Sequence, residues 1–250
     1  MCRTMEEYLF MEKSFRKILD SLIKEYNNTY YSIPEIQEYK IINNDKIGGY
    51  FDTHDLYNKK YILYLSQAFF DNKDQYLKSL LFHELTHIYD STIFSAFDWE
   101  TYLYIMQICS EVHASEIEMD VLLEDIDNLN VNSIIEYYNI PIYKFIAIQL
   151  CNVNKEFTLP DGPIFKGEFK FNCKILYYFI GFIRSLKKHN IECKFEYSKK
   201  IPSELLDIFN KITYYYLNNE DIDYEILYSY QKEILNITKK ILKEHQEQYN

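Results

Sequence analysis

Glycine and proline are both scarce in this sequence, which has only 5 of each in 250 residues. Collagen-like and low-complexity chains need far more of them, and an all-β sandwich needs turn residues at every strand reversal. The scarcity excludes the first two architectures and disfavours the third. Because 48% of the residues are hydrophobic and 26% are charged, the chain can bury a core as one domain or two closely packed ones, and a mainly helical protein is expected.

Long apolar runs are also missing. The longest, residues 175–183 (ILYYFIGFI), is far shorter than the roughly 20 residues that cross a bilayer. Near the N-terminus, Glu6, Glu7 and Glu12 interrupt any segment that resembles the apolar part of a signal peptide. We therefore expect a cytoplasmic protein that has no membrane partner.

Positive charge is in short supply. The chain has 27 lysine and arginine residues against 38 aspartate and glutamate residues, so its formal net charge is -11. Nucleic-acid binding depends largely on basic side chains that neutralise phosphates, and the sequence contains no basic patch. A nucleic-acid partner is therefore not expected, and the acidic surface weakly favours basic or neutral substrates.

Cysteine is present, but not in the patterns that build a disulfide or metal framework. The five cysteines are widely separated and include no CxxC pair (Cys2, Cys109, Cys151, Cys173 and Cys193). An odd number of isolated cysteines is typical of reduced thiols rather than of a disulfide framework or a cysteine-based zinc site. Their expected role is packing.

The first third of the chain mixes helical and strand patterns. Apolar residues recur at three- and four-residue spacing over 5–26, which predicts an amphipathic helix. Between residues 38 and 66, short apolar stretches alternate with turn-forming residues, which predicts a small antiparallel meander. A polar opening with Asp71 or Asn72 as the N-cap, followed by an apolar run, predicts a helix over 73–89.

Almost everything after residue 97 has the helical period. We predict helices over three ranges, 99–127, 132–153 (divided near Pro141) and 168–189. Two more are expected from Pro202 and from residue 221 onward, the last with a buried apolar stripe (Ile222, Ile226, Tyr230, Ile234, Ile237 and Ile241). The expected fold class is α+β and mainly helical, with a small antiparallel sheet and a helical C-terminal extension.

The motif His83-Glu84-Leu85-Thr86-His87 lies in the helix predicted over 73–89. On an α-helix, two histidines four residues apart project from the same face, so both imidazoles can reach one tetrahedral metal ion while Glu84 leans over the open coordination position. The flanking residues are uncharged, as expected of a helix buried in a core. Because a buried glutamate without a partner costs several kcal/mol, a metal site is favoured over an ordinary buried helix.

Glu111 is the candidate for the third protein ligand. It lies 24 residues after His87 on the next predicted helix, where it shares one face with Ala114, Ser115 and Glu118. Ala114 would let the two helices approach closely, and Ser115 could hydrogen-bond to a metal-bound histidine. Four other residues of this helix are candidates for the same role: His113, Glu116, Glu118 and Asp120. Glu116 is the weakest of the carboxylates, because it points to another face of the helix.

An HExxH helix followed by a glutamate on the next helix resembles the gluzincin branch of zinc metallopeptidases, and the pattern from Glu111 to Ser115 is similar to the third-ligand helix of the ImmA/IrrE group. The resemblance covers roughly residues 60–120 and implies a zincin-like core, which we place at 1–128, with a helical region over 129–250. It further implies that His83, His87 and Glu111 hold Zn²⁺. Glu84 would then be the catalytic base for hydrolysis of a protein or peptide substrate by a zinc-activated water.

Neighbouring residues have weaker cases. Asp90 could brace His87 or simply end the helix, and His113 or Tyr89 could donate a hydrogen bond to the transition state. A metzincin is excluded, because Asp90 and Ile93 stand where that clan needs glycine and then histidine or aspartate. The strand predicted over 61–66 lies where zinc peptidases commonly hold an extended substrate by backbone hydrogen bonds.

Two other functions are open from the sequence. One is a catalytically silent zincin-like module that binds or regulates a partner, and the other is a helical interaction protein whose HExxH motif is coincidental. Intact Glu84 speaks against the first, because a binding module needs no general base. Metal analysis of the purified protein tests the second.

Overall fold

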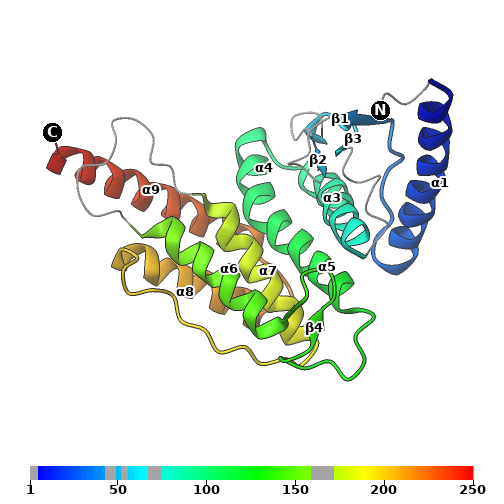
Figure 1. The fold of residues 1–250 in the computed structure, drawn as a ribbon. Helices are drawn as coiled ribbons and strands as arrows, with labels where there is room; N and C mark the ends of the chain where they lie inside the picture. Colours follow the sequence, from blue (N-terminus) through cyan, green and yellow to red (C-terminus); the bar gives the residue numbers. More distant parts are fainter. Residues whose placement is uncertain (1–4, 43–48, 52–55, 67–74, 159–171, 250) are drawn as a thin grey trace. The chain divides into compact units, whose positions relative to one another are not determined.

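The computed structural model describes residues 5–42, 49–51, 56–66, 75–158 and 172–249 (Figure 1). Helices make up most of the described chain, and the strands form two small sheets. The α+β, mainly helical class predicted from the sequence is therefore confirmed. The chain divides into two compact units, Met1–Ala96 and Phe97–Asn250.

The larger sheet, in the first unit, is mixed rather than antiparallel. Its strands β1 (Glu38–Ile42), β2 (Gly49–Phe51) and β3 (Ile62–Ser66) follow the order β1-β3-β2. β2 runs antiparallel to β3, but β1 runs parallel to it. The predicted antiparallel pairing is confirmed for β2 and β3, but the parallel pairing of β1 with β3 differs from the predicted meander. A parallel pair requires a connection of a dozen or more residues, and residues 43–61 separate these two strands. β3 consequently has a partner on both edges.

Helix α1 (Met5–Thr29) confirms the helix predicted near the N-terminus. Helix α3 (Gln75–Phe94) contains the HExxH motif and continues past the predicted end at residue 89. The predicted N-caps Asp71 and Asn72 lie outside the described residues. One face of α3 is buried, and the aliphatic residues on it have almost no exposed surface (Leu81, Leu85 and Ile88).

The second unit begins with one continuous helical run. Asp98 caps α4 (Trp99–Ile105) by accepting hydrogen bonds from the backbone N–H groups of Glu100 and Thr101. A π-helical segment, η2 (Met106–Ser110), follows, and α5 (Glu111–Leu123) completes the run. The sequence predicted a single α-helix to residue 127, so the π segment was not foreseen and the run ends four residues early.

A hairpin replaces the first part of the helix predicted over 132–153. Strands β4 (Ile134–Ile135) and β5 (Ile140–Pro141) pair antiparallel, and α6 (Ile142–Phe157) follows directly. Asn130 explains the difference, because its side-chain oxygen accepts from the backbone N–H of Asn132 at 3.0 Å and competes with a helical start. Asn139, at a φ of 50°, closes the turn in the left-handed region that asparagine tolerates.

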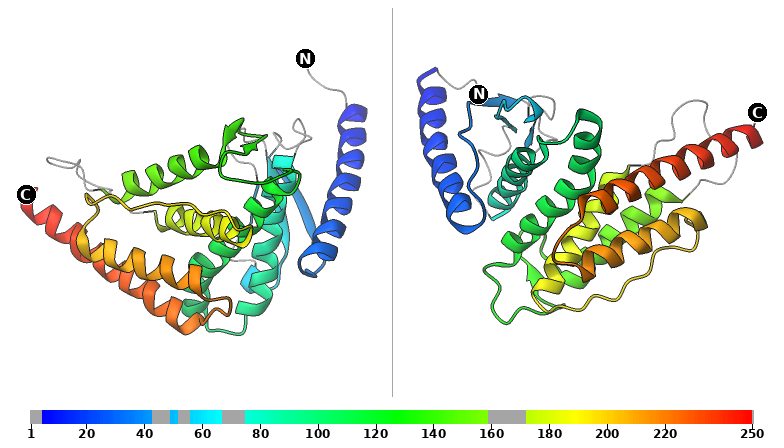
Figure 2. Two further views of the ribbon diagram at one scale, coloured as in Figure 1. Left: turned by 90° about the horizontal axis from the view of Figure 1, so that it is seen from below. Right: turned by 180° about the vertical axis from the view of Figure 1, so that it is seen from behind.

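Three further helices complete the unit, α7 (Cys173–Lys188), α8 (Ser203–Asn218) and α9 (Tyr224–Tyr249). α8 and α9 pack on each other and lie side by side in both views of Figure 2. Asn190, in the left-handed region just after the C-cap His189 of α7, lets the chain turn so that the N–H of Ile191 bonds the carbonyl of Leu186 at 2.8 Å. Residues 168–171 of the helix predicted over 168–189 lie outside the described residues.

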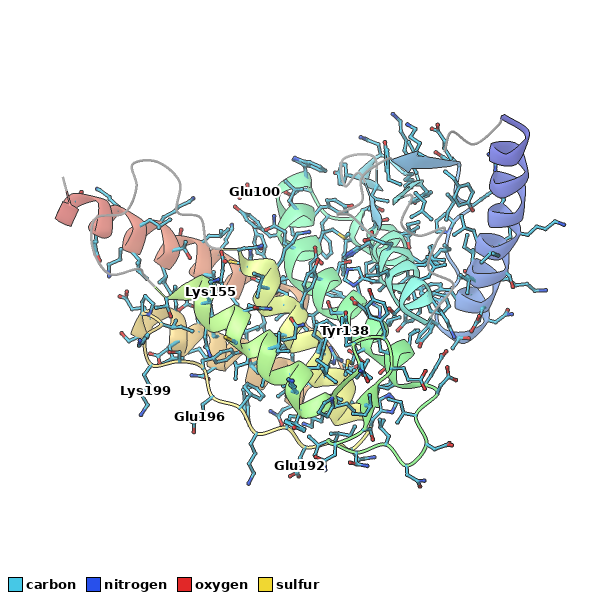
Figure 3. The ribbon with its side chains drawn as sticks, viewed as in Figure 1. Glu100, Tyr138, Lys155, Glu192, Glu196 and Lys199 are labelled. Atoms are coloured by element: carbon cyan, nitrogen blue, oxygen red, sulfur yellow. The ribbon has the colours of Figure 1, made fainter. Side chains whose placement is uncertain are left out.

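The segment between α7 and α8 is extended, and burial alternates along it. Ile191 and Tyr197 are buried, whereas Glu192 and Glu196 are exposed. Figure 3 shows Glu192, Glu196 and Lys199 pointing away from the helices of this unit. The inward residues add to the core of the unit, since the Tyr197 ring lies 5.8 Å from that of Phe209 on α8.

α5 belongs to the second unit because it packs closely on α7. A Cβ added to Gly181 of α7 would collide with the carbonyl oxygen of Val112 and lie 2.7 Å from the Cβ of Ser115. Only glycine fits there. The division between the compact units falls after residue 96, because α5 is joined to residues of α7 that follow it by more than 60 positions.

The buried stripe of α9 differs from the one predicted. Its buried residues recur at spacings of four and three (Leu227, Gln231, Ile234, Thr238 and Ile241). Ile226, which the sequence pattern placed inside, is 38% exposed. The polar Gln231 takes a central position in the stripe, because hydrogen bonds to its amide offset the cost of burying it.

Candidate metal centre

His83 and His87 are placed by α3 as a pair. Their Nε2 atoms lie 3.2 Å apart, and their rings meet edge to face with centroids 4.8 Å apart. Two nitrogen ligands on a tetrahedral zinc ion, each at about 2.0–2.1 Å, are separated by about 3.3 Å. The spacing of the two nitrogens therefore fits one shared ion, and His83 is only 5% exposed.

Thr86 anchors the middle of the motif from the buried side of α3. Its hydroxyl donates to the carbonyl of Phe82 at 2.7 Å and shares a hydrogen bond of 3.0 Å with Tyr26 of α1. Burial raises the pKa of Tyr26 well above its usual range, so the phenol keeps its proton. Sequence reasoning missed this role, because Tyr26 is one of 26 tyrosines and reads as an ordinary member of an apolar face.

Glu84 follows His83 directly, so its side chain is turned by about 100° from that of His83 around α3. It is half-buried, whereas Leu85 and Thr86 beside it are buried. A half-buried carboxylate in this position can be reached by water and is next to a candidate metal ligand. This is the placement that a general base in an HExxH site requires.

Glu111 is the first residue of α5, and it comes directly after the π segment. It is 4% exposed, and its Oε1 atom lies 2.5 Å from Nζ of Lys174 on α7. Within the described residues, His83, His87 and Glu111 form a group that could hold a metal ion, with one ligand atom from each lying within 4.8 Å of the others.

Two rival carboxylates of α5, Glu116 and Asp120, bind cations of α7, as Glu111 also does, but they lie outside the three-residue group. Glu116 lies 3.1 Å from Nε of Arg184. Asp120 accepts from the Ser185 hydroxyl at 2.6 Å and lies 2.6 Å from Nζ of Lys188. Glu118 and His113 are not part of the three-residue group. These contacts make Glu116 and Asp120 part of the packing between two helices.

The other candidate residues fall in different surroundings. Asp90 does not end α3, which continues to Phe94, and it is buried. Tyr89 stacks on Tyr31 with ring centroids 4.1 Å apart. On an α-helix, Tyr89 points about 200° away from His87, and His113 points the same angle away from Glu111. A role as transition-state donor is therefore less suited to either residue than packing.

Ser115 lies at the contact between α5 and α7, as its distance from the Gly181 position shows. It is fully buried, and its hydroxyl has no hydrogen-bond partner among the described residues. Lys174, the ion-pair partner of Glu111, was not predicted from the sequence. No local signal marks it, because the contact joins residues 63 positions apart.

Comparison of the chain with family models, with curated proteins and with solved structures finds no match in any of the three. Among the described helices, none combines the length and apolar character that crossing a membrane requires.

Proposed function

We propose that the protein is a zinc-dependent metallopeptidase in which His83, His87 and Glu111 bind one zinc ion. The observation that carries the proposal is the group formed by these three side chains. Two histidines, one carboxylate and a water are a donor set of catalytic zinc sites, in which the fourth position stays open to substrate. The spacing of the two Nε2 atoms supports the same ion.

Glu84 is the proposed general base. Bound zinc supplies Lewis acidity and lowers the pKa of a water at the open position to about 7. Glu84 accepts the proton of the water that attacks the scissile carbonyl and then passes it to the leaving amine. Its half-buried position beside His83 suits both transfers, because the carboxylate can be reached by water and by substrate.

An extended substrate would bind at an outer edge of the mixed sheet. β3, which the sequence suggested for this role, is paired on both sides by β1 and β2. A further strand can add only where backbone N–H and C=O groups are not already paired. The proposed substrate edge therefore moves from β3 to β2 or β1.

A catalytically silent zincin-like binding module is the second candidate, and one observation favours it. The Glu111 carboxylate has a cation of the chain itself beside it, the Lys174 ammonium. In a silent module this ion pair could replace the metal altogether. The two candidates differ in metal content and in their dependence on Glu84.

The test uses the full chain and two readouts. Elemental analysis of the purified protein should find close to one zinc per chain, and His87→Ala should lose most of it. Glu84→Gln should retain zinc but hydrolyse a mixture of synthetic peptides about 10²–10⁴-fold more slowly, with products followed by mass spectrometry. Glu100→Gln is the matched control, because Glu100 is an exposed glutamate near the start of α4 (Figure 3).

Each outcome decides between the candidates. Wild-type protein that folds without metal excludes the peptidase and supports a silent module in which the Glu111–Lys174 ion pair replaces the metal. Zinc-loaded protein in which wild type and Glu84→Gln behave identically in every assay supports the silent module. Loss of hydrolysis in Glu84→Gln but not in Glu100→Gln supports the peptidase.

A further inference from the structure

A π-helical turn directly precedes the proposed ligand Glu111. The run from Trp99 to Leu123 is α-helical except for Met106–Ser110. A π segment takes up one residue more than an α-helix of the same rise, so it turns everything after it by about 100° relative to an unbroken helix. The direction in which Glu111 points, relative to α4, therefore depends on this segment.

The sequence of the π segment, MQICS, contains neither glycine nor proline. Wide turns of this kind disturb the regular hydrogen-bond ladder, and buried backbone groups that lose a helical partner need another one. Contacts from elsewhere in the unit must therefore stabilise the segment. Tyr216 bonds a backbone carbonyl of the segment and Gln231 bonds a side chain of it, and both belong to the C-terminal helices.

The first is Tyr216 of α8. Its hydroxyl donates at 3.3 Å to the backbone carbonyl of Ile108, in the middle of the π segment, and the same carbonyl accepts from the backbone N–H of Glu111. Tyr216 and Ile108 are almost completely buried. Burial raises the pKa of Tyr216 well above its usual range, so the hydroxyl stays protonated and able to donate. The ring itself is held by Arg184, whose guanidinium carbon lies 5.7 Å from the ring centroid.

The second is Gln231 of α9, which is 1% exposed. Its Nε2 atom donates to Oε1 of Gln107 in the π segment at 3.3 Å, and its Oε1 atom accepts from the Tyr177 hydroxyl. A buried glutamine is costly unless its amide is hydrogen-bonded on both sides. These bonds explain why the buried stripe of α9 contains a glutamine at its centre.

We infer that Tyr216 and Gln231 are positioning residues that hold the π-helical turn and thereby fix the direction of Glu111 as a metal ligand. The inference rests on the proposed zinc site. It gives the C-terminal helices α8 and α9 a function in metal binding although neither contributes a ligand. Loss of either hydrogen bond favours the ordinary α-helical register, in which Glu111 points elsewhere.

The test compares two tyrosine-to-phenylalanine variants of the full chain. Tyr216→Phe removes the hydroxyl that bonds Ile108. Tyr197→Phe is the control, because Tyr197 is also buried and bonds Thr213 of α8 at 2.8 Å without contacting the π segment. Zinc affinity is measured by competition with a chromophoric chelator, stability by urea unfolding, and the ligand set by the visible absorption of the Co²⁺-loaded protein.

Tyr216→Phe should bind zinc more weakly, by no more than the about 10- to 100-fold that loss of a group bonded directly to a metal ligand costs, and its cobalt spectrum should change in intensity and position. Tyr197→Phe should lose stability to a similar extent but keep the zinc affinity and the cobalt spectrum of the wild type. Gln231→Leu, which removes the bond to Gln107, should weaken zinc binding in the same direction. It provides a second measurement if Tyr216→Phe does not fold.

Other results overturn the inference. If the wild type binds zinc and Tyr216→Phe and Gln231→Leu bind it equally well, the π segment does not depend on these bonds. If Tyr197→Phe weakens zinc binding as much as Tyr216→Phe does, the effect is one of general stability. A wild type that binds no zinc overturns the proposed function itself. This result differs from the two above, in which the wild type binds zinc.

Discussion

The proposed ligands are held by two different kinds of helix. His83 and His87 lie four residues apart on α3, an α-helix without interruption, and their spacing follows from that helix alone. Glu111 starts a helix whose direction depends on a π turn, on Gly181 of α7 and on side chains from α8 and α9. Local geometry is enough for a pair of ligands, whereas a single distant ligand needs support from several parts of the chain.

Removal of a proposed ligand, on α3 or on α5, should cause the largest loss of zinc affinity. Glu111→Ala should weaken zinc binding by more than the about 100-fold that loss of an outer partner costs, and His87→Ala should do the same. Glu116→Ala is the control on α5. It removes an ion pair with Arg184, so it should lower the free energy of unfolding but leave zinc affinity unchanged. A zinc titration that finds Glu116→Ala damaging and Glu111→Ala silent would show that the wrong carboxylate was chosen.

Gly181→Ala should have the next largest effect, and it should disturb Glu111 on α5 but not the histidine pair on α3. The added Cβ would meet the Val112 carbonyl and Ser115, so α7 and α5 must move apart at a cost of about 1–3 kcal/mol in the free energy of unfolding. Zinc affinity should also fall, because α5 carries Glu111. The spacing of the histidine pair on α3 should not change. Urea unfolding combined with zinc titration measures both effects, and wild-type stability would contradict the close packing.

Lys174→Met should strengthen zinc binding by a few-fold. The lysine ammonium lies 2.5 Å from Glu111 and competes with a divalent cation for the same carboxylate, although its half-exposed side chain weakens the effect by solvent screening. Lys188→Met provides the control, because Lys188 contacts Asp120 and Glu116 instead. The gain should shrink as salt is added. Weaker zinc binding in Lys174→Met would mean that the lysine supports the ligand rather than competing for it.

Tyr26→Phe should have the smallest effect and should not alter zinc affinity. It removes the bond to Thr86, at a cost of about 1 kcal/mol in the free energy of unfolding. Since burial raises the pKa of Tyr26 in the folded state, the stability that this tyrosine contributes is fully present below about pH 10 and is lost as pH rises above it. The difference between wild type and Tyr26→Phe should therefore shrink above that pH in urea unfolding.

The features that the sequence predicted correctly are those decided by neighbouring residues. The HExxH helix is one of them, because its apolar flanks and its spacing act within a few turns of α3. Glu111 could be proposed because the carboxylates on one helix are few enough to rank by face. The contacts of Glu116 and Asp120 with α7, by contrast, join residues more than 60 positions apart, and no local pattern shows them.

The features that were predicted wrongly depend on distant partners. β1 pairs parallel with β3 across a long crossover, which alternation within each strand cannot reveal. Gln231 replaces an apolar residue in the α9 stripe because of its bonds to Tyr177 and Gln107. The π segment contains no glycine or proline that could have marked it in the sequence. We infer that contacts from α8 and α9 stabilise it instead.

The π turn also determines where the chain can tolerate a change of length. It contains one residue more than an α-helix needs, so a deletion within Met106–Ser110 would restore regular helix and rotate Glu111 by about 100° relative to α4. The same deletion over residues 124–128 would shorten only the connection that follows α5. Single-residue deletions along residues 99–128 should therefore remove metal binding at the π turn and leave it intact after Leu123.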